Sequence, residues 1–364
     1  MPRFKAFVIA VTVLVLFAVG IRIPQTISSS GLDYPINMSL QDTLLAVSDP
    51  SNGVHIFDVG NPADPVYHLH IPLAGNTGTA LKDNVLYANE YGLLHVFRLN
   101  ENSYEMVKTF EAEAEEAVPF FEGAVMNSHS GMWGCSCYGS SGSVQAPEGS
   151  STGSSYAKFA VVGSHLYYLH HYKIVTMDIT TPEDPVETSR VPVGGDIETL
   201  FPSEDYLFVG GRRGMYILDR SDPAKPVQIG RVEHFEACDP VVVRDALAFV
   251  TLRGGNACGQ TQDLLLSVDI RIPSKPVVLA EKPLKSPYGL TVNENLLYVS
   301  SGRHGFGLLD VADPVDPVYI ETWPEWPTKD FIWHGNTLFV LGFGDLRIFD
   351  VSAPENPLLL SSVD

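Results

Sequence analysis

A motif that recurs along the chain constrains the fold more than any other feature of the sequence. In each copy a run of β-forming residues ends in Asp and is followed by three residues, Pro, two residues and Pro-Val. The copies are DVGNPADPV from Asp58, DITTPEDPV from Asp178, DRSDPAKPV from Asp219, DIRIPSKPV from Asp269, DVADPVDPV from Asp310, DVSAPENPL from Asp350 and, without the prolines, RLNENSYEM from Arg98. The first residues of successive copies are 40, 80, 41, 50, 41 and 40 positions apart. The spacing of 80 is one repeat plus an insertion, and the spacing of 50 is one repeat with a longer loop.

Each repeat contains short runs rich in β-branched and aromatic residues. The last one shows four of them, DFIWHG, TLFVLG, DLRIFD and PLLLSS. Four antiparallel strands in about 40 residues, repeated along a chain, are typical of propeller blades. We therefore expect an all-β, seven-bladed β-propeller with four antiparallel strands per blade and a long loop insertion after the second blade. The first blade begins near Ile36 and the last ends near Leu360, so both ends of the propeller meet at one seam.

The aspartates and prolines of the motif have a structural explanation. An Asp at the end of a strand can accept hydrogen bonds from turn N–H groups, and proline fixes φ in a loop that does not join the ladder. The Pro-Val pair then begins the outer strand, where a missing donor is tolerated. We interpret the six aspartates as structural residues and not as metal ligands, and we expect no cofactor.

The repeats resemble those of the LVIVD-repeat proteins, which are bacterial surface or exported β-propellers, over roughly residues 40 to 361. The motifs ETLF…LFVGGRRGMYILD and CDPVVV…AFVTLRGGNACG also resemble a subgroup that carries a Gly/Ser-rich, cysteine-containing insertion. The resemblance implies a propeller outside the cytoplasm. It implies no particular reaction.

The charge of the chain limits its partners. Its 23 Lys and Arg residues against 43 Asp and Glu residues give a net charge of −20. A surface this acidic repels phosphate backbones, so we expect no nucleic-acid partner. Hydrophobic residues make up 45% of the sequence, which favours a packed core over global disorder.

The N-terminus has the pattern of an export signal. Residues 1–30 are interpreted as a signal peptide or an N-terminal membrane anchor plus linker, and residues 31–364 as the propeller, with an inserted loop at 111–157. The apolar run Ala6–Ile21 would span only about 24 Å as a helix, short of a hydrocarbon core of about 30 Å. Ala18-Val19-Gly20 offers a small-x-small cleavage site. Either alternative places the propeller outside the cytoplasm, in the periplasm, at the cell surface or secreted, with membrane contact only through an uncleaved N-terminal segment.

Four cysteines, Cys135, Cys137, Cys238 and Cys258, would then lie in an oxidising compartment. Cys238 and Cys258 fall in segments that share a blade and a face, so a disulfide between them is geometrically reasonable. Cys135 and Cys137 would remain as a Cys-x-Cys pair in the insertion, as a local disulfide, as free thiols or, with His129, as metal ligands. Pairing of the insertion cysteines with Cys238 or Cys258 is the further alternative.

The loops between the second and third strands of the blades carry the candidate site. Because connections alternate between the two faces of a propeller, these loops share a face with the crossovers between blades. Cationic and imidazole side chains gather there: Arg212, Arg213, Arg253, Arg303, His170, His171, His304 and, from a crossover, His234. Arginine is suited to bidentate recognition of carboxylate, sulfate or phosphate groups.

Three functions fit this face. The first is a binding module for an anionic small molecule, a glycan or a surface protein. The second is a polysaccharide lyase in which Arg neutralises a uronate carboxylate and His171 or Tyr172 acts as the base. The third is a surface scaffold, in which the arginines pair with acidic neighbours, namely Asp196, Glu198, Glu236, Asp239 or Asp330. The sequence identifies no catalytic residue and leans away from an enzyme.

Overall fold

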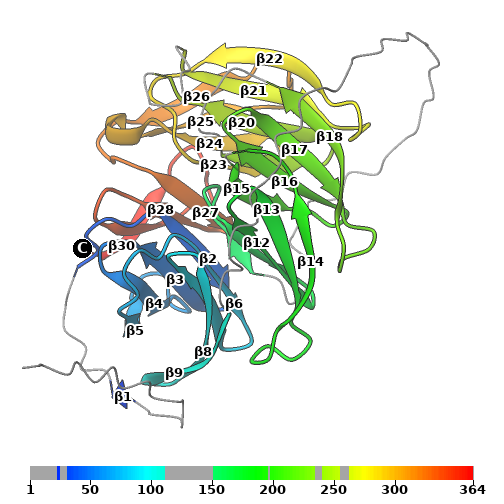
Figure 1. Cartoon of the computed structure of the whole chain (residues 1–364). Helices are drawn as coiled ribbons and strands as arrows, with labels where there is room; N and C mark the ends of the chain where they lie inside the picture. The colour runs from blue at the N-terminus through cyan, green and yellow to red at the C-terminus, as the bar shows by residue number, and fades with distance from the viewer. Residues whose placement is uncertain are drawn as a thin grey trace, which may run out of the picture.

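Seven antiparallel sheets form a ring in the computed structural model, which describes residues 23–24, 31–110, 151–195, 197–233, 240–254 and 262–363 (Figure 1). The described part contains strands and one short 3-10 turn, η1 (Gly302–His304). The predicted all-β fold, with seven blades and four antiparallel strands per blade, is confirmed. Figure 1 shows the blades following one another around the ring in chain order.

The strands of each blade run from the centre of the ring outward. Blade 1 contains β2 (Asn37–Gln41), β3 (Leu44–Asp49), β4 (Gly53–Asp58) and β5 (Val66–Ile71), and blade 2 contains β6 (Thr79–Lys82), β7 (Val85–Glu90), β8 (Leu93–Asn100) and β9 (Ser103–Phe110). Blade 3 contains β11 (Phe159–Val162), β12 (His165–His170), β13 (Lys173–Asp178) and β14 (Val186–Pro192). Blade 4 contains β15 (Ile197–Pro202), β16 (Tyr206–Gly211), β17 (Gly214–Asp219) and β18 (Val227–Glu233). Blade 5 contains β19 (Val241–Arg244), β20 (Leu247–Leu252), β21 (Leu264–Asp269) and β22 (Val277–Pro283). Blade 6 contains β23 (Leu290–Asn293), β24 (Leu296–Ser300), β25 (Phe306–Asp310) and β26 (Val318–Trp323). Blade 7 contains β27 (Asp330–His334), β28 (Thr337–Leu341), β29 (Leu346–Asp350) and β30 (Leu358–Val363).

Two short strands extend these sheets. β1 (Ile23–Pro24) pairs with the outer strand β9 of blade 2. β10 (Thr152–Gly153) pairs with the inner strand β2 of blade 1, opposite Ser39 and Leu40. Residues that follow the insertion therefore return to the centre of the ring.

The hydrophobic core is divided among the seven interfaces between neighbouring blades. Each of seven clusters of buried side chains combines residues of two adjacent sheets. Phe208 of blade 4, for example, packs with Val250 and Leu266 of blade 5. A blade buries its apolar faces only against its neighbours, so the closed ring is the unit of stability.

The six aspartates of the repeat have the structural role that the sequence predicts. Each carboxylate accepts a hydrogen bond from the backbone N–H two residues later, at 2.7 to 2.9 Å; these bonds join Asp58 to Gly60, Asp178 to Thr180, Asp219 to Ser221, Asp269 to Arg271, Asp310 to Ala312 and Asp350 to Ser352. The turns end the third strand of each blade and begin the outer strand on the face opposite to the candidate site.

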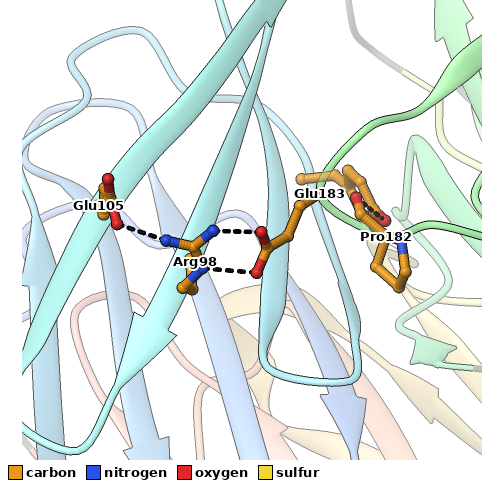
Figure 2. Close-up of polar contacts among 5 residues, drawn as sticks. Arg98, Glu105, Pro182 and Glu183 are labelled. Atoms are coloured by element: carbon orange, nitrogen blue, oxygen red, sulfur yellow. Dashed lines mark hydrogen bonds and ion pairs between the residues drawn. The ribbon is translucent and has the colours of Figure 1, made fainter. Parts of the chain in front are cut away.

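Side chains tie several of the turns to the preceding blade. The hydroxyl groups of three buried tyrosines donate to the carbonyl of the first proline in the next blade's turn, in the pairs Tyr87–Pro182, Tyr167–Pro223 and Tyr298–Pro354, at 2.6 to 2.8 Å. In blade 2, where Arg98 replaces the aspartate, the guanidinium adds a second contact to the same turn of blade 3. Figure 2 shows it between Glu105 of its own blade and Glu183 of blade 3, with both oxygens of Glu183 engaged.

The seam between blades 7 and 1 is closed without a shared strand in the described residues. All four strands of blade 7 come from the C-terminal end, β27 to β30. Closure depends on a core cluster that joins Met38 and Phe57 to Ile332 and Phe339. Two hydrogen bonds also cross the seam: Lys329 Nζ donates to Pro35 O and Ser361 Oγ donates to Pro62 O, both at 2.7 Å.

The predicted N-terminal signal or anchor and the predicted cysteine pairings lie outside the described residues. Within the described ranges, no helix has both the length and the apolar character needed to cross a membrane. No group of three or more His, Cys, Asp or Glu side chains in those ranges is placed to hold a metal ion.

Candidate functional site: a cation-bearing face

The second-to-third-strand loops and the crossovers lie on one face, as the alternation of connections predicts. Backbone hydrogen bonds join the two kinds of segment in several blades, in the pairs Gly75 N–Pro50 O, Val193 N–Tyr172 O, Leu284 N–Asp263 O and Thr328 N–Gly302 O. The candidate arginines and histidines of these loops are therefore on the same side of the ring as the crossovers. They contribute to three places on this face.

Two of the arginines meet on a pair of aromatic rings contributed by blades 5 to 7. The Arg253 guanidinium carbon lies 4.0 Å from the ring centre of Tyr288, and that of Arg303 lies 4.7 Å from the ring centre of Phe343. The two rings contact each other edge to face, with centres 6.0 Å apart. Arg253 follows β20, Arg303 belongs to η1, Tyr288 precedes β23 and Phe343 follows β28, so the ring architecture brings four distant segments together.

A third cation joins this group from the crossover before β27. Lys329 Nζ lies 5.1 Å from the centre of the Phe343 ring and 3.8 Å from that of Tyr34, which precedes blade 1. We refer to the set Tyr34, Arg253, Tyr288, Arg303, Lys329 and Phe343 as the aromatic–cation cluster. Cations over aromatic faces are attracted by the ring quadrupole, typically by about 0.5–2 kcal/mol.

The electrostatics of the cluster favour an incoming negative charge. Burial lowers the pKa of Lys329 to about 8; Asp49 acts in the opposite direction and the nearby Arg303 adds to the lowering. The Asp49 carboxylate already accepts hydrogen bonds from Tyr34 N at 2.7 Å and Ser51 N at 2.9 Å. Across the described ranges, neither Arg303 nor Lys329 forms an ion pair with a carboxylate.

Arg213 lies in a different place, a hollow of about 300 Å³ in blade 4. Arg231 of the outer strand lines the same hollow and pairs with Glu233 at 2.5 Å. Arg212 is half-buried beside it and has a partner of its own. His170 and His171 line a third place, a hollow between blades 2 and 3, with their ring centres 4.4 Å apart. His304 is exposed in η1, and His234 lies outside the described residues.

The centre of the ring is occupied by the segment that follows the insertion. Residues 151–157, which the sequence assigns to the inserted loop, lie between the inner strands of several blades. Met38 N of blade 1 donates to Ser154 Oγ at 3.2 Å, Leu290 N of blade 6 to Ser155 Oγ at 3.0 Å, and Leu200 N of blade 4 to Ala157 O at 2.7 Å. We call residues 151–157 the central segment. It fills the position at which a ligand on the propeller axis would otherwise lie.

Asp330 of blade 7 fixes the central segment and is fully buried. Its carboxylate accepts hydrogen bonds from Ser155 Oγ at 2.6 Å, Tyr156 N at 2.9 Å and Phe331 N at 2.9 Å. Burial nevertheless raises the pKa of Asp330 to about 6, because desolvation outweighs these bonds. The scaffold alternative predicts Asp330 as a partner for the arginines. In the structure its partners are serine and backbone groups, since the carboxylate points to the centre of the ring.

The comparisons with known proteins agree with this architecture. The family model described as LVIVD repeat matches residues 194–234 and 328–364, which contain blades 4 and 7. A search of curated proteins finds no match.

Among solved structures, a protein from Lactobacillus plantarum has a TM-score of 0.60 at 12% identity, covering 90% of this chain and 96% of that one. The periplasmic gluconolactonase PpgL of Pseudomonas aeruginosa has a TM-score of 0.59 at 10% identity, with coverage of 90% and 96%. BamB from Moraxella catarrhalis has a TM-score of 0.54 at 11% identity, with coverage of 86% and 81%. Identities this low concern the fold alone. The chain is therefore a seven-bladed β-propeller that carries LVIVD repeats in two of its blades, the fourth and the seventh.

Proposed function

We propose that the chain is an extracytoplasmic binding module that holds an anionic ligand, a glycan or a surface partner on the cation-bearing face. The aromatic–cation cluster is the observation that carries this proposal. Three cations from three loops converge on one aromatic pair in a chain whose net charge is −20. Of the three, only Lys329 is buried, and neither it nor the exposed Arg303 is neutralised by a carboxylate in the described ranges, so the cluster offers positive charge to an anion.

The chemistry of the cluster favours an acidic sugar as the ligand. Guanidinium groups bind carboxylates in a bidentate manner, and aromatic faces pack against the C–H surfaces of sugar rings. The exposed side chains of Arg303 and Tyr34 would contact the ligand first. Location outside the cytoplasm is supported by the N-terminal sequence pattern and by the shared fold with PpgL, which is a periplasmic protein.

The lyase alternative has less support. It requires His171 and Tyr172 to act at one point, but the His171 ring contacts His170, and the ammonium group of Lys173 lies 5.3 Å from the centre of the Tyr172 ring. These contacts point the two candidate bases to different neighbours. A binding function needs no such pairing.

Substituting Arg303 with alanine is expected to weaken the binding of an acidic oligosaccharide by about tenfold or more, because a charge-assisted pair contributes about 1.5–3 kcal/mol. Oligogalacturonate is the probe, and isothermal titration calorimetry is the measurement. The exposed position of Arg303 leaves the fold intact.

The matched control is Arg271→Ala, which removes an exposed arginine from the turn face, where it pairs with Asp269. This variant should bind like the parent. A neutral oligosaccharide of equal length should not bind at all. Equal affinities of the Arg303→Ala variant and the parent would contradict the proposed site.

A further inference from the structure

A second site is built into the hollow between blades 2 and 3. Its volume is about 170 Å³, which equals about five or six water molecules at about 30 Å³ each. Lys158, His170 and His171 line the side of blade 3. Asn89 and Leu93 line the side of blade 2. The hollow is thus small, and it combines cationic, imidazole, amide and apolar groups.

His170 lines this hollow and carries an unsatisfied ring nitrogen. Its Nε2 atom is buried and has no hydrogen-bond partner in the described structure. Burial lowers the pKa of His170, and the neighbouring His171, Arg190 and Lys173 lower it further, against the opposite effect of Glu187. The imidazole is therefore neutral at pH 7 and offers one N–H donor. Buried polar atoms rarely remain without a partner, so this nitrogen indicates a missing ligand or water.

Lys158 supplies the charge. Its side chain is partly buried, and in the described ranges its ammonium group forms no hydrogen bond or ion pair. Burial lowers the pKa of Lys158, although Glu198 raises it. An anion placed beside this ammonium would offset the lost solvation.

We propose that this hollow binds a small organic carboxylate, with the carboxylate between the Lys158 ammonium and the His170 and His171 rings. Lys158 is the only lysine or arginine among the described residues that line the hollow, which matches a ligand with a single negative charge. Leu93 and Leu169 provide apolar contact for a short carbon chain. The site shares no residue with the aromatic–cation cluster, so it stands independently of the oligosaccharide site.

Lactate and inorganic phosphate serve as the two probes. Lactate is expected to shift the ring resonances of His170 in ¹H–¹³C NMR spectra, which are assigned by their loss in His170→Gln. Lys158→Met is expected to weaken lactate binding by about tenfold or more, measured by calorimetry. Lys225→Met removes an exposed lysine from a turn on the opposite face and should bind lactate like the parent.

His171→Asn provides a second variant that should retain the fold. His171 is exposed and has a φ of 53°, a conformation that asparagine tolerates well. It should also weaken lactate binding, whereas Arg303→Ala should leave it unchanged. The proposal is overturned if lactate fails to shift His170 in the parent protein, if phosphate binds more tightly than lactate, or if the Lys158 and Lys225 variants bind equally.

Discussion

Substituting Asp330 with alanine is expected to lower the free energy of unfolding by about 3 kcal/mol or more. The change leaves the Ser155 hydroxyl and the N–H groups of Tyr156 and Phe331 without their acceptor in the buried centre of the ring. Each buried donor that loses its partner costs about 1–3 kcal/mol. Denaturant unfolding monitored by circular dichroism measures the effect. Asp33→Ala, at an exposed position, is the control and should stay within about 0.5 kcal/mol of the parent.

The same residue gives the protein a pH dependence with a defined sign. The pKa of Asp330 is raised to about 6 in the folded protein, against about 3.9 in an unfolded chain. The folded state therefore binds the proton more tightly. The stability that this proton contributes is fully present below pH of about 4 and is lost as the pH rises through about 6.

Comparison with Asp330→Asn isolates this contribution from the other titrating groups. The free energy of unfolding of the parent minus that of the variant should fall by about 2–3 kcal/mol between pH of about 4 and about 7. A difference that stays constant or increases over this range would show that the Asp330 carboxyl group is not protonated preferentially in the fold.

Substituting Gly230 with alanine is expected to cost about 3 kcal/mol, the upper end of the range for overpacking. Gly230 lies in β18, and a Cβ atom there would come within 1.9 Å of the Pro273 carbonyl oxygen in the turn of blade 5. Because the obstacle is backbone, a side-chain rotation cannot relieve it, and the two blades must separate. Thermal and denaturant unfolding measure the loss.

Gly195→Ala is the matched control for this substitution. A Cβ atom at Gly195 meets nothing within 4 Å, so its stability should differ little from that of the parent. If the two alanine variants unfold at the same denaturant concentration, the close approach of blades 4 and 5 does not limit stability.

The architecture was predictable because it repeats. The recurring Asp and prolines fix the number of blades and the turn conformation, and the hydrogen bond from Gly60 N to Asp58 is reproduced in five other blades. The central segment was not predictable from such a pattern. Its Ser-rich sequence is typical of a linker, and the contacts that order Ser154 and Ser155 come from strands far away in the chain and occur only once.

The candidate site was predictable in part. The sequence places Arg253 and Arg303 on one face, because successive loops between antiparallel strands alternate between the two faces of the ring. The aromatic partners Tyr288 and Phe343 lie in segments without a repeated motif, so their meeting depends on crossover geometry. Lys158 was missed for a similar reason, since it stands alone in sequence and gains significance only from its burial beside His170.

The closure between blades 7 and 1 has a mechanical consequence. If a blade combines strands from both ends of a chain, several backbone hydrogen bonds carry tension between those ends together. Side-chain packing joins every pair of neighbouring blades, but in the described part of the chain no crossover connects blade 7 to blade 1, so the load at this seam falls on packing and on separate bonds such as Lys329 to Pro35 and Ser361 to Pro62. A pull on opposite ends of the propeller would therefore separate blade 1 from blade 7 before it breaks the backbone hydrogen bonds within a sheet.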